Sequence, residues 1–169
     1  LAVRQGGPER RAESREAVLD LLWTDRFKTQ AQGSLRQVLF QLGDGVVAAT
    51  RTELALGEAI TSCDVWSLES AARARDAATL ASIGEVYAGR LLDGLNGLSA
   101  SFEHWLAIQR AQYESLLEAS QLRAAGLFAA DGRLGDAVAV LARLLRLLPS
   151  CHAAAERLMR LHTQAGDVQ

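Results

Sequence analysis

The chain has 169 residues, a net charge of −2 and a hydrophobic content of 49%, which suffice for one or two small domains with a buried core. No stretch approaches the roughly 18 uninterrupted apolar residues of a membrane span, and the opening residues lack the apolar core of a signal peptide, so we expect a cytoplasmic protein that does not contact membranes. Cys63 and Cys151 are far apart, and the three histidines are scattered without a metal-ligand or catalytic spacing. We therefore expect no metal, no cofactor and no enzymatic activity.

The first predicted elements are two helices separated by a polar loop. Residues 14–23, SREAVLDLLW, open with Ser14 as a helix cap and place Val18, Leu19, Leu22 and Trp23 on one face. Residues 34–42, SLRQVLFQL, repeat apolar side chains at helical spacing, namely Leu35, Val38, Leu39 and Leu42. These four leucine and valine side chains are expected to form the buried face of the second helix.

A short β-region is predicted next. Residues 46–65 are rich in Val, Thr and Ile and are punctuated by Gly45 and Gly57, which indicates two or three short strands. In one of them Leu54 and Leu56 alternate with more polar neighbours. A helix pair followed by a β-hairpin has the shape of a winged helix, although any other small α+β unit fits the same pattern.

From Asp64 onward the composition shifts to Ala, Leu and Arg, which favours helices throughout and places a boundary near residues 62–65. Helices are expected at about 65–75, 77–88, 101–130, 134–148 and 151–165. In the third of these an apolar stripe runs through Phe102, Leu106, Tyr113, Leu117, Ala124 and Phe128. This part of the chain is predicted to be all-helical.

The end of the chain contains a weak repeat. Gly132 and Gly166 are 34 positions apart, each after a helix, and 34 residues is the period of the tetratricopeptide helix pair. With this register, Ala125, Phe128 and Ala137 occupy packing positions of the repeat. The Trp and Gly positions of the repeat are held by Gln121 and Ala125 instead.

Several segments in order resemble SARP-type transcriptional regulators: SREAVLDLLWTDR, QGSLRQVLFQL, SCDVW, YAGRLLDGL, FEHWLAIQR and the long run from AADGRLGDAV to LHTQAGD. The resemblance implies a mainly α fold with an N-terminal winged-helix-like α+β unit, residues 1–62, followed by a tetratricopeptide-like bacterial transcriptional activator domain, residues 63–169. It also implies that the winged helix is N-terminally truncated here, because the family begins with a small sheet and a complete first helix.

The resemblance assigns roles to particular residues. Residues 30–42 are similar to the recognition helix, and the implied DNA-binding residues are Lys28, Gln30, Gly33, Ser34, Arg36, Gln37 and Arg51. The loop that contacts RNA polymerase in such proteins would include Trp23, Asp25, Arg26 and Phe27. In the helical region, Phe102, Trp105 and Arg110 would fix the long helix against its neighbours.

On a helical wheel the outward side of residues 30–42 carries Gln30, Gly33, Arg36, Gln37, Phe40 and Gln41. Arg36 suits guanine and Gln37 suits adenine, whereas Phe40 suits either a thymine methyl group or a protein contact. Because Thr24 to Leu42 carries a balance of only +2, we expect weak binding of duplex DNA.

Two functions follow from these patterns. The first is a DNA-binding transcriptional regulator whose helical domain contacts RNA polymerase, another protein or a second copy of the chain as a homodimer. The alternative is a tetratricopeptide-type interaction or signalling module with a degenerate winged helix that does not bind DNA.

Overall fold

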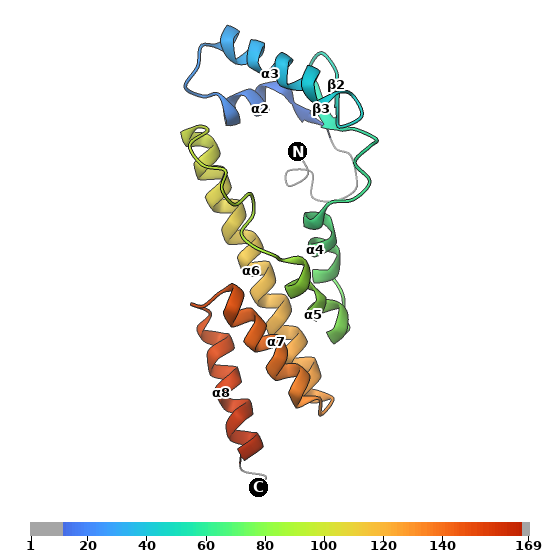
Figure 1. Ribbon diagram of the computed structural model, residues 1–169, viewed down its shortest axis with the longest axis vertical. Helices are drawn as coiled ribbons and strands as arrows, with labels where there is room; N and C mark the ends of the chain where they lie inside the picture. The colour runs from blue at the N-terminus through green and yellow to red at the C-terminus, as the bar shows by residue number, and fades with distance from the viewer. Residues whose placement is uncertain (1–11, 167–169) are drawn as a thin grey trace. The chain divides into compact units, whose positions relative to one another are not determined.

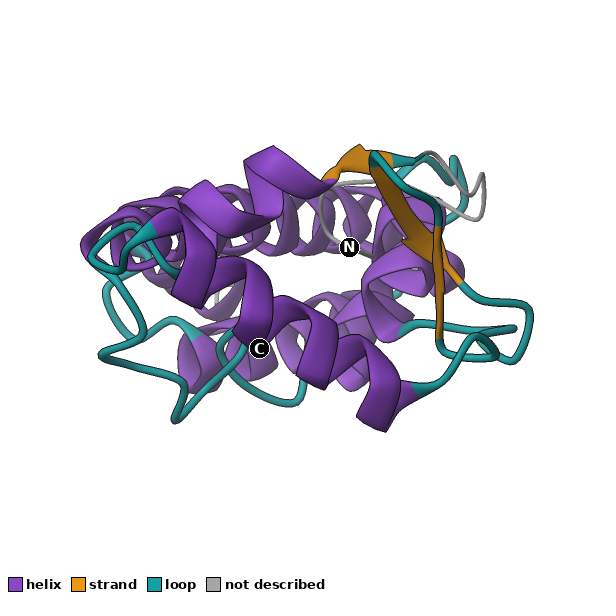
Figure 2. Cartoon of the chain, turned by 90° about the horizontal axis from the view of Figure 1, so that it is seen from above, coloured by secondary structure: helices purple, strands orange, loops and turns teal. Residues whose placement is uncertain are grey.

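The computed structural model describes residues 12–166, which are mainly helical with one small antiparallel sheet near the N-terminal end (Figures 1 and 2). The elements in chain order are β1 (Glu13–Ser14), α2 (Arg15–Leu22), α3 (Lys28–Leu42), β2 (Val47–Ala49), β3 (Glu53–Leu56), α4 (Asp64–Ala72), α5 (Ala77–Val86), α6 (Ala100–Ala130), α7 (Leu134–Leu147) and α8 (His152–Gly166). The predicted fold class, mainly helical with an N-terminal α+β portion, is confirmed at this level.

The chain divides into two compact units. The first comprises the described residues up to Trp66 together with Leu91–Arg110, and the second comprises Ser67–Arg90 and the chain from Ala111 onward. The sequence analysis assigned the whole stretch after residue 62 to one helical domain. Leu91–Arg110 instead packs with the N-terminal residues, so the first residues of α6 are part of the first unit.

The first unit is organised around a three-stranded sheet with strand order β1-β3-β2. Ser14 ends β1 and caps α2, because its Oγ accepts a hydrogen bond from the amide of Ala17 at 3.0 Å. Antiparallel pairing sets Val47 opposite Leu56 and Glu13 opposite Leu54. The core beneath the sheet consists of five buried side chains, namely Leu19, Ala31, Leu35, Val47 and Leu54.

The buried face of α3 differs from the predicted one. Ala31 and Leu35 are buried and Leu39 is partly buried, whereas Val38 and Leu42 are 38% and 45% exposed. Because the helix begins at Lys28, its contact with the core runs along positions 31, 35 and 39 at steps of four residues. The expected role of Val38 and Leu42 in that buried face is therefore wrong.

The segment before α6 is joined to α2 within the first unit. Ser99 is buried, accepts a hydrogen bond from the amide of Phe102 and donates one to the carbonyl oxygen of Leu21 at 2.6 Å. Arg110 donates to the carbonyl oxygens of Leu91 and Leu92, both at 2.9 Å. Leu92 has a positive φ of 49°, so the Arg110 guanidinium fixes a turn that a leucine rarely adopts.

The second unit is a set of packed helices with a mainly apolar core. Its fully buried apolar side chains come from α5, α6, α7 and α8, and include Leu80, Ile83, Leu117, Ala124, Ala137, Leu141, Leu144 and Ala154. Gln121 is also fully buried, and its Nε2 donates to the carbonyl oxygen of Leu80 at 2.8 Å. Gly84 lies against this amide, since a Cβ added there would come within 2.9 Å of Gln121 Oε1.

The predicted positions of the helices after residue 62 agree closely with those observed, and the predicted apolar stripe of α6 is buried along its length. The second predicted helix begins at Lys28 and not at Ser34, so part of the expected polar loop is helical. Sequence reasoning missed β1, a two-residue strand that pairs with β3 some forty residues later. The predicted β-region extends to residue 65, whereas Cys63 lies in coil just before α4. Among the residues described, no helix is long and apolar enough to cross a membrane.

Candidate nucleic-acid interface

The outward side of α3 is the surface on which the sequence analysis placed most of its DNA-binding residues. Opposite the buried Ala31 and Leu35, the helix presents Gln30, Arg36, Gln37, Phe40 and Gln41, all of which are exposed. Gly33 lies in the same stripe, and a Cβ added to it would have no other atom within 4 Å. Packing inside the unit therefore does not require glycine at this position.

The N-terminal end of α3 has no side-chain cap and begins with a lysine. Phe27 is the N-cap residue and supplies no side-chain hydrogen bond, and the first turn contains no acidic residue. Lys28 begins the helix and its Nζ lies 2.9 Å from Glu16 Oε1 of α2. This hydrogen bond and the accompanying charge attraction raise the pKa of Lys28 and lower the pKa of Glu16, so both groups are charged at neutral pH.

The loop between α2 and α3 contacts the side of α3. Arg26 Nη1 donates to Ser34 Oγ at 3.4 Å, which brings a predicted polymerase-contact residue together with a predicted DNA-binding residue. Ser34 is half-buried and therefore less available than its outward neighbours. In the same loop Trp23 is packed against the core, whereas Asp25 and Phe27 are exposed, Phe27 to 80%.

Arg51 occupies the turn between β2 and β3 and is exposed. The turn is closed by the amide of Thr50, which donates to the carbonyl oxygen of Glu53 at 2.9 Å. Arg15 also holds it, because the backbone amide of Arg15 donates to the carbonyl oxygen of Thr52 and its Nη1 donates to that of Thr50. Arg15 was not among the predicted site residues, and its role depends on pairing between residues 35 positions apart.

Charge distinguishes α3 from its surroundings. Of the helices in the described part of the chain, α3 alone contains no Asp or Glu, while it carries Lys28 and Arg36. The described residues of the first unit as a whole contain six Lys and Arg and ten Asp and Glu. Among these helices α3 therefore has the largest excess of cationic over anionic side chains, although its Lys28 is paired with Glu16 of α2.

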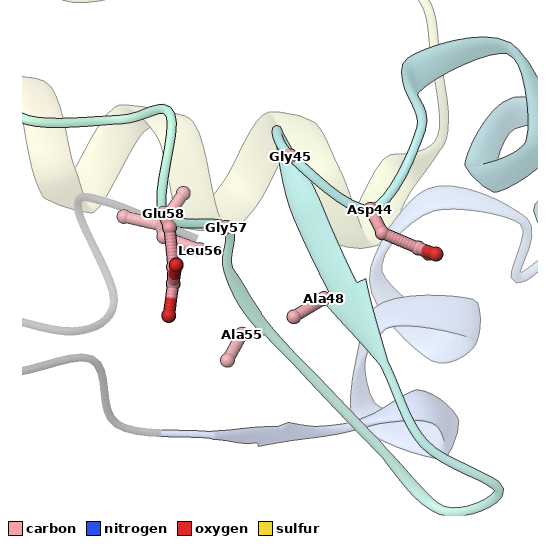
Figure 3. A pocket seen from close by; sticks show the side chains of 7 residues that line it. All are labelled: Asp44, Gly45, Ala48, Ala55, Leu56, Gly57 and Glu58. Carbon is pink, nitrogen blue, oxygen red and sulfur yellow. The ribbon is translucent and has the colours of Figure 1, made fainter.

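A hollow of about 530 Å³ lies on the outer side of the β-hairpin. Figure 3 shows Ala48 of β2 and Ala55 of β3 next to each other along it, with the remaining lining from Asp44, Gly45, Leu56, Gly57 and Glu58. Gly57 is required there by close approach, since a Cβ would lie 2.2 Å from the carbonyl oxygen of Gly45. The lining contains two carboxylates and no cation, so the hollow is not suited to a phosphate.

The predicted DNA-binding residues therefore fall into three groups. The outward stripe of α3 carries Gln30, Gly33, Arg36 and Gln37, with the half-buried Ser34 beside it. Lys28 lies at the N-terminal end of this helix, and Arg51 lies at the hairpin turn. Sequence reasoning did not foresee that Glu16 pairs with Lys28, because the two residues lie on different helices. No group of three or more metal-ligating side chains occurs within the described residues.

Comparison with protein-family models, with curated proteins and with solved structures found no match to this chain.

Proposed function

We propose that the chain is a DNA-binding transcriptional regulator in which the first unit is a winged helix and α3 enters the major groove. The order strand, helix, helix, strand, strand supports this, together with a sheet in which the last strand lies between the other two. In this arrangement α3 is the recognition helix and the turn at Arg51 is the wing. The resemblance of the sequence to SARP-type regulators, in which a winged helix is expected at this end of the chain, is a second reason for the proposal.

The observation that carries the proposal is the outward stripe of α3, which exposes base-binding side chains on a helix without a carboxylate. Arg36 has the donor pair that matches guanine O6 and N7, and Gln37 has the amide that matches adenine N6 and N7. Each such bidentate pair is worth about 1 to 3 kcal/mol of discrimination. At Gly33 the absence of a side chain leaves room for a base edge or a backbone phosphate near the helix.

Phosphate binding is assigned to the N-terminal end of α3 and to the wing. The first turn of α3, which has no side-chain cap, and Lys28 favour an anion, and Arg51 supplies a second cation at the hairpin. With about three cations available, affinity is expected to be weak and to fall by about an order of magnitude or more between 50 and 200 mM salt.

The second unit is assigned to protein contacts as a tetratricopeptide-like domain. Ala125, Phe128 and Ala137 are buried at the packing positions that the 34-residue register assigns to them. The Arg133 guanidinium lies over the Phe128 ring near the end of α6, 4.5 Å from the centre of the ring. The expected partners are RNA polymerase, reached also through the loop at Asp25 and Phe27, or a second copy of the chain.

A titration of labelled duplexes followed by fluorescence anisotropy tests DNA binding. Arg36→Ala is expected to remove most sequence preference, whereas Lys28→Ala is expected to weaken binding about equally on all duplexes. Arg146→Ala is the matched control, since Arg146 is an exposed arginine on α7 of the second unit. Salt-insensitive binding that survives Arg36→Ala would show that another surface binds the DNA.

The alternative function, an interaction module that does not bind DNA, is favoured by one observation. The first unit has more carboxylates than cations, and two of its phenylalanines, Phe27 and Phe40, are largely exposed. In the same titration this alternative predicts no salt-dependent binding of any duplex. Capture of RNA polymerase by the wild-type chain, lost in Phe27→Ala, would then support it.

A further inference from the structure

Phe40 is the most exposed large hydrophobic side chain of the described residues, with 89% of its surface accessible. It contributes nothing to the core of the first unit, which is formed by smaller side chains of α3 such as Ala31 and Leu35. Burying a phenylalanine is worth about 1.5 to 3 kcal/mol, and here that free energy is not used in folding. A partner that covered Phe40 would recover this free energy on binding.

The position of Phe40 on the helix indicates which partner. It follows Gln37 by three residues and Arg36 by four, so the three side chains are neighbours on the outward stripe. The other exposed apolar residues of α3, Val38 and Leu42, are each two positions from Phe40 and therefore about 160° around the helix. Phe40 is thus an isolated apolar group among amide and guanidinium groups, unlike the clustered anchors of a protein-binding helix.

We propose that Phe40 contacts the C5-methyl group of a thymine in the major groove and so makes α3 selective for a thymine at one position of its site. This inference rests on the proposed DNA binding and adds a specificity-determining residue to it. Thymine is the one DNA base that presents an apolar group in the major groove, and contact of Phe with this methyl is a known form of base recognition.

The helix geometry also places this thymine. Phe40 lies about 4.5 Å beyond Gln37 and about 6 Å beyond Arg36 along the axis, given a rise of about 1.5 Å per residue. Base pairs are separated by about 3.4 Å, so the thymine is expected one or two base pairs from those contacted by Arg36 and Gln37. The absence of any carboxylate on α3 is compatible with this end of the helix also lying close to the DNA.

The test uses two pools of randomised duplexes, one made with thymidine and one with deoxyuridine, which lacks the C5-methyl group. The full 169-residue chain is expected to enrich a fixed thymine from the first pool and no fixed base at that position from the second. For the enriched duplex, replacing that thymine by uracil is expected to weaken binding about fourfold, the ratio that one methylene-sized apolar group supplies. The same replacement is expected to leave the affinity of Phe40→Ala unchanged.

Phe27→Ala is the matched control, because Phe27 is the other largely exposed phenylalanine of the unit and lies at the opposite end of α3. It is expected to respond to uracil as the wild type does, and thermal denaturation checks that both variants are folded. If Arg36→Ala weakens binding but uracil does not, the inference is wrong and the proposed function stands. If neither pool is enriched at all, both are wrong.

Discussion

The two units of this chain use their apolar residues differently. The second unit has a core of fully buried side chains, with Leu80, Leu117 and Leu141 at 0% exposure, and its helices meet through them. The first unit has a smaller core, and its α3 leaves an aromatic and two aliphatic side chains exposed. The apolar residues of the second unit therefore serve mainly in packing, whereas α3 of the first unit has an exposed surface, to which we assign the proposed DNA contact.

The largest expected effect concerns packing in the second unit. Leu141→Ala removes a fully buried side chain of α7, so unfolding should become easier by about 2 to 5 kcal/mol. Leu134→Ala on the same helix removes a side chain that is already 38% exposed, and should change stability by no more than about 0.5 kcal/mol. Urea denaturation of both variants measures the difference. Equal midpoints would mean that the core of this unit is not closely packed.

A helical glycine gives the next test. In Gly84→Ala the new methyl group would lie 2.9 Å from Gln121 Oε1 and 3.0 Å from Arg143 Cδ. The amide of Gln121 is buried and held by the carbonyl oxygen of Leu80, so it cannot move freely. We expect a loss of about 1 to 3 kcal/mol in the free energy of unfolding.

The control for Gly84 is Gly126→Ala on α6. Its added Cβ would meet only Arg157 Nη1, at 3.9 Å, so the substitution should stabilise the helix by up to about 1 kcal/mol. A denaturation midpoint that does not fall in Gly84→Ala would contradict the close contact between α5 and Gln121.

These two units also differed in how far the sequence predicted them. The helices of the second unit were located within a few residues, because Leu117, Ala124 and Phe128 repeat at a spacing that only a helix brings to one face. The local pattern was sufficient there, since the same side chains define the helix and its packing.

The first unit was predicted less completely because its structure depends on distant pairs. Nothing in residues 13 and 14 indicates a strand, and β1 exists only through its pairing with β3. The assignment of Ser99 to the first unit likewise depends on its hydrogen bond to Leu21, 78 residues earlier. On α3 the outward residues were predicted correctly, but Val38 was misplaced because Ala31 gives a weak hydrophobic signal despite being buried.

An alanine at Gly33 is expected to stabilise the protein, unlike an alanine at Gly84, and the same variant also tests duplex binding. Because nothing lies within 4 Å of an added Cβ, Gly33→Ala should stabilise α3 by about 0.5 to 1 kcal/mol. If the gap at Gly33 admits DNA, the same methyl group should weaken duplex binding about tenfold, equivalent to about 1.4 kcal/mol. Thermal denaturation and anisotropy on one preparation measure both effects. A more stable variant with unchanged affinity would remove Gly33 from the DNA interface.

The smallest expected effect concerns the ion pair at the start of α3. Glu16 holds Lys28 through a 2.9 Å contact and places a negative charge beside the proposed phosphate site. Both side chains are largely exposed, so the pair adds little to folding, and Glu16→Gln should leave the denaturation midpoint nearly unchanged. Removing the carboxylate should nevertheless strengthen duplex binding about twofold to fivefold at 50 mM salt, and the gain should shrink at 200 mM because salt screens exposed charges.

Glu103→Gln is the control, since it removes one carboxylate from the same unit but on α6. An equal gain in both variants would show that net charge, and not the release of Lys28, controls affinity, whereas a gain confined to Glu16→Gln would place the phosphate at the N-terminal end of α3.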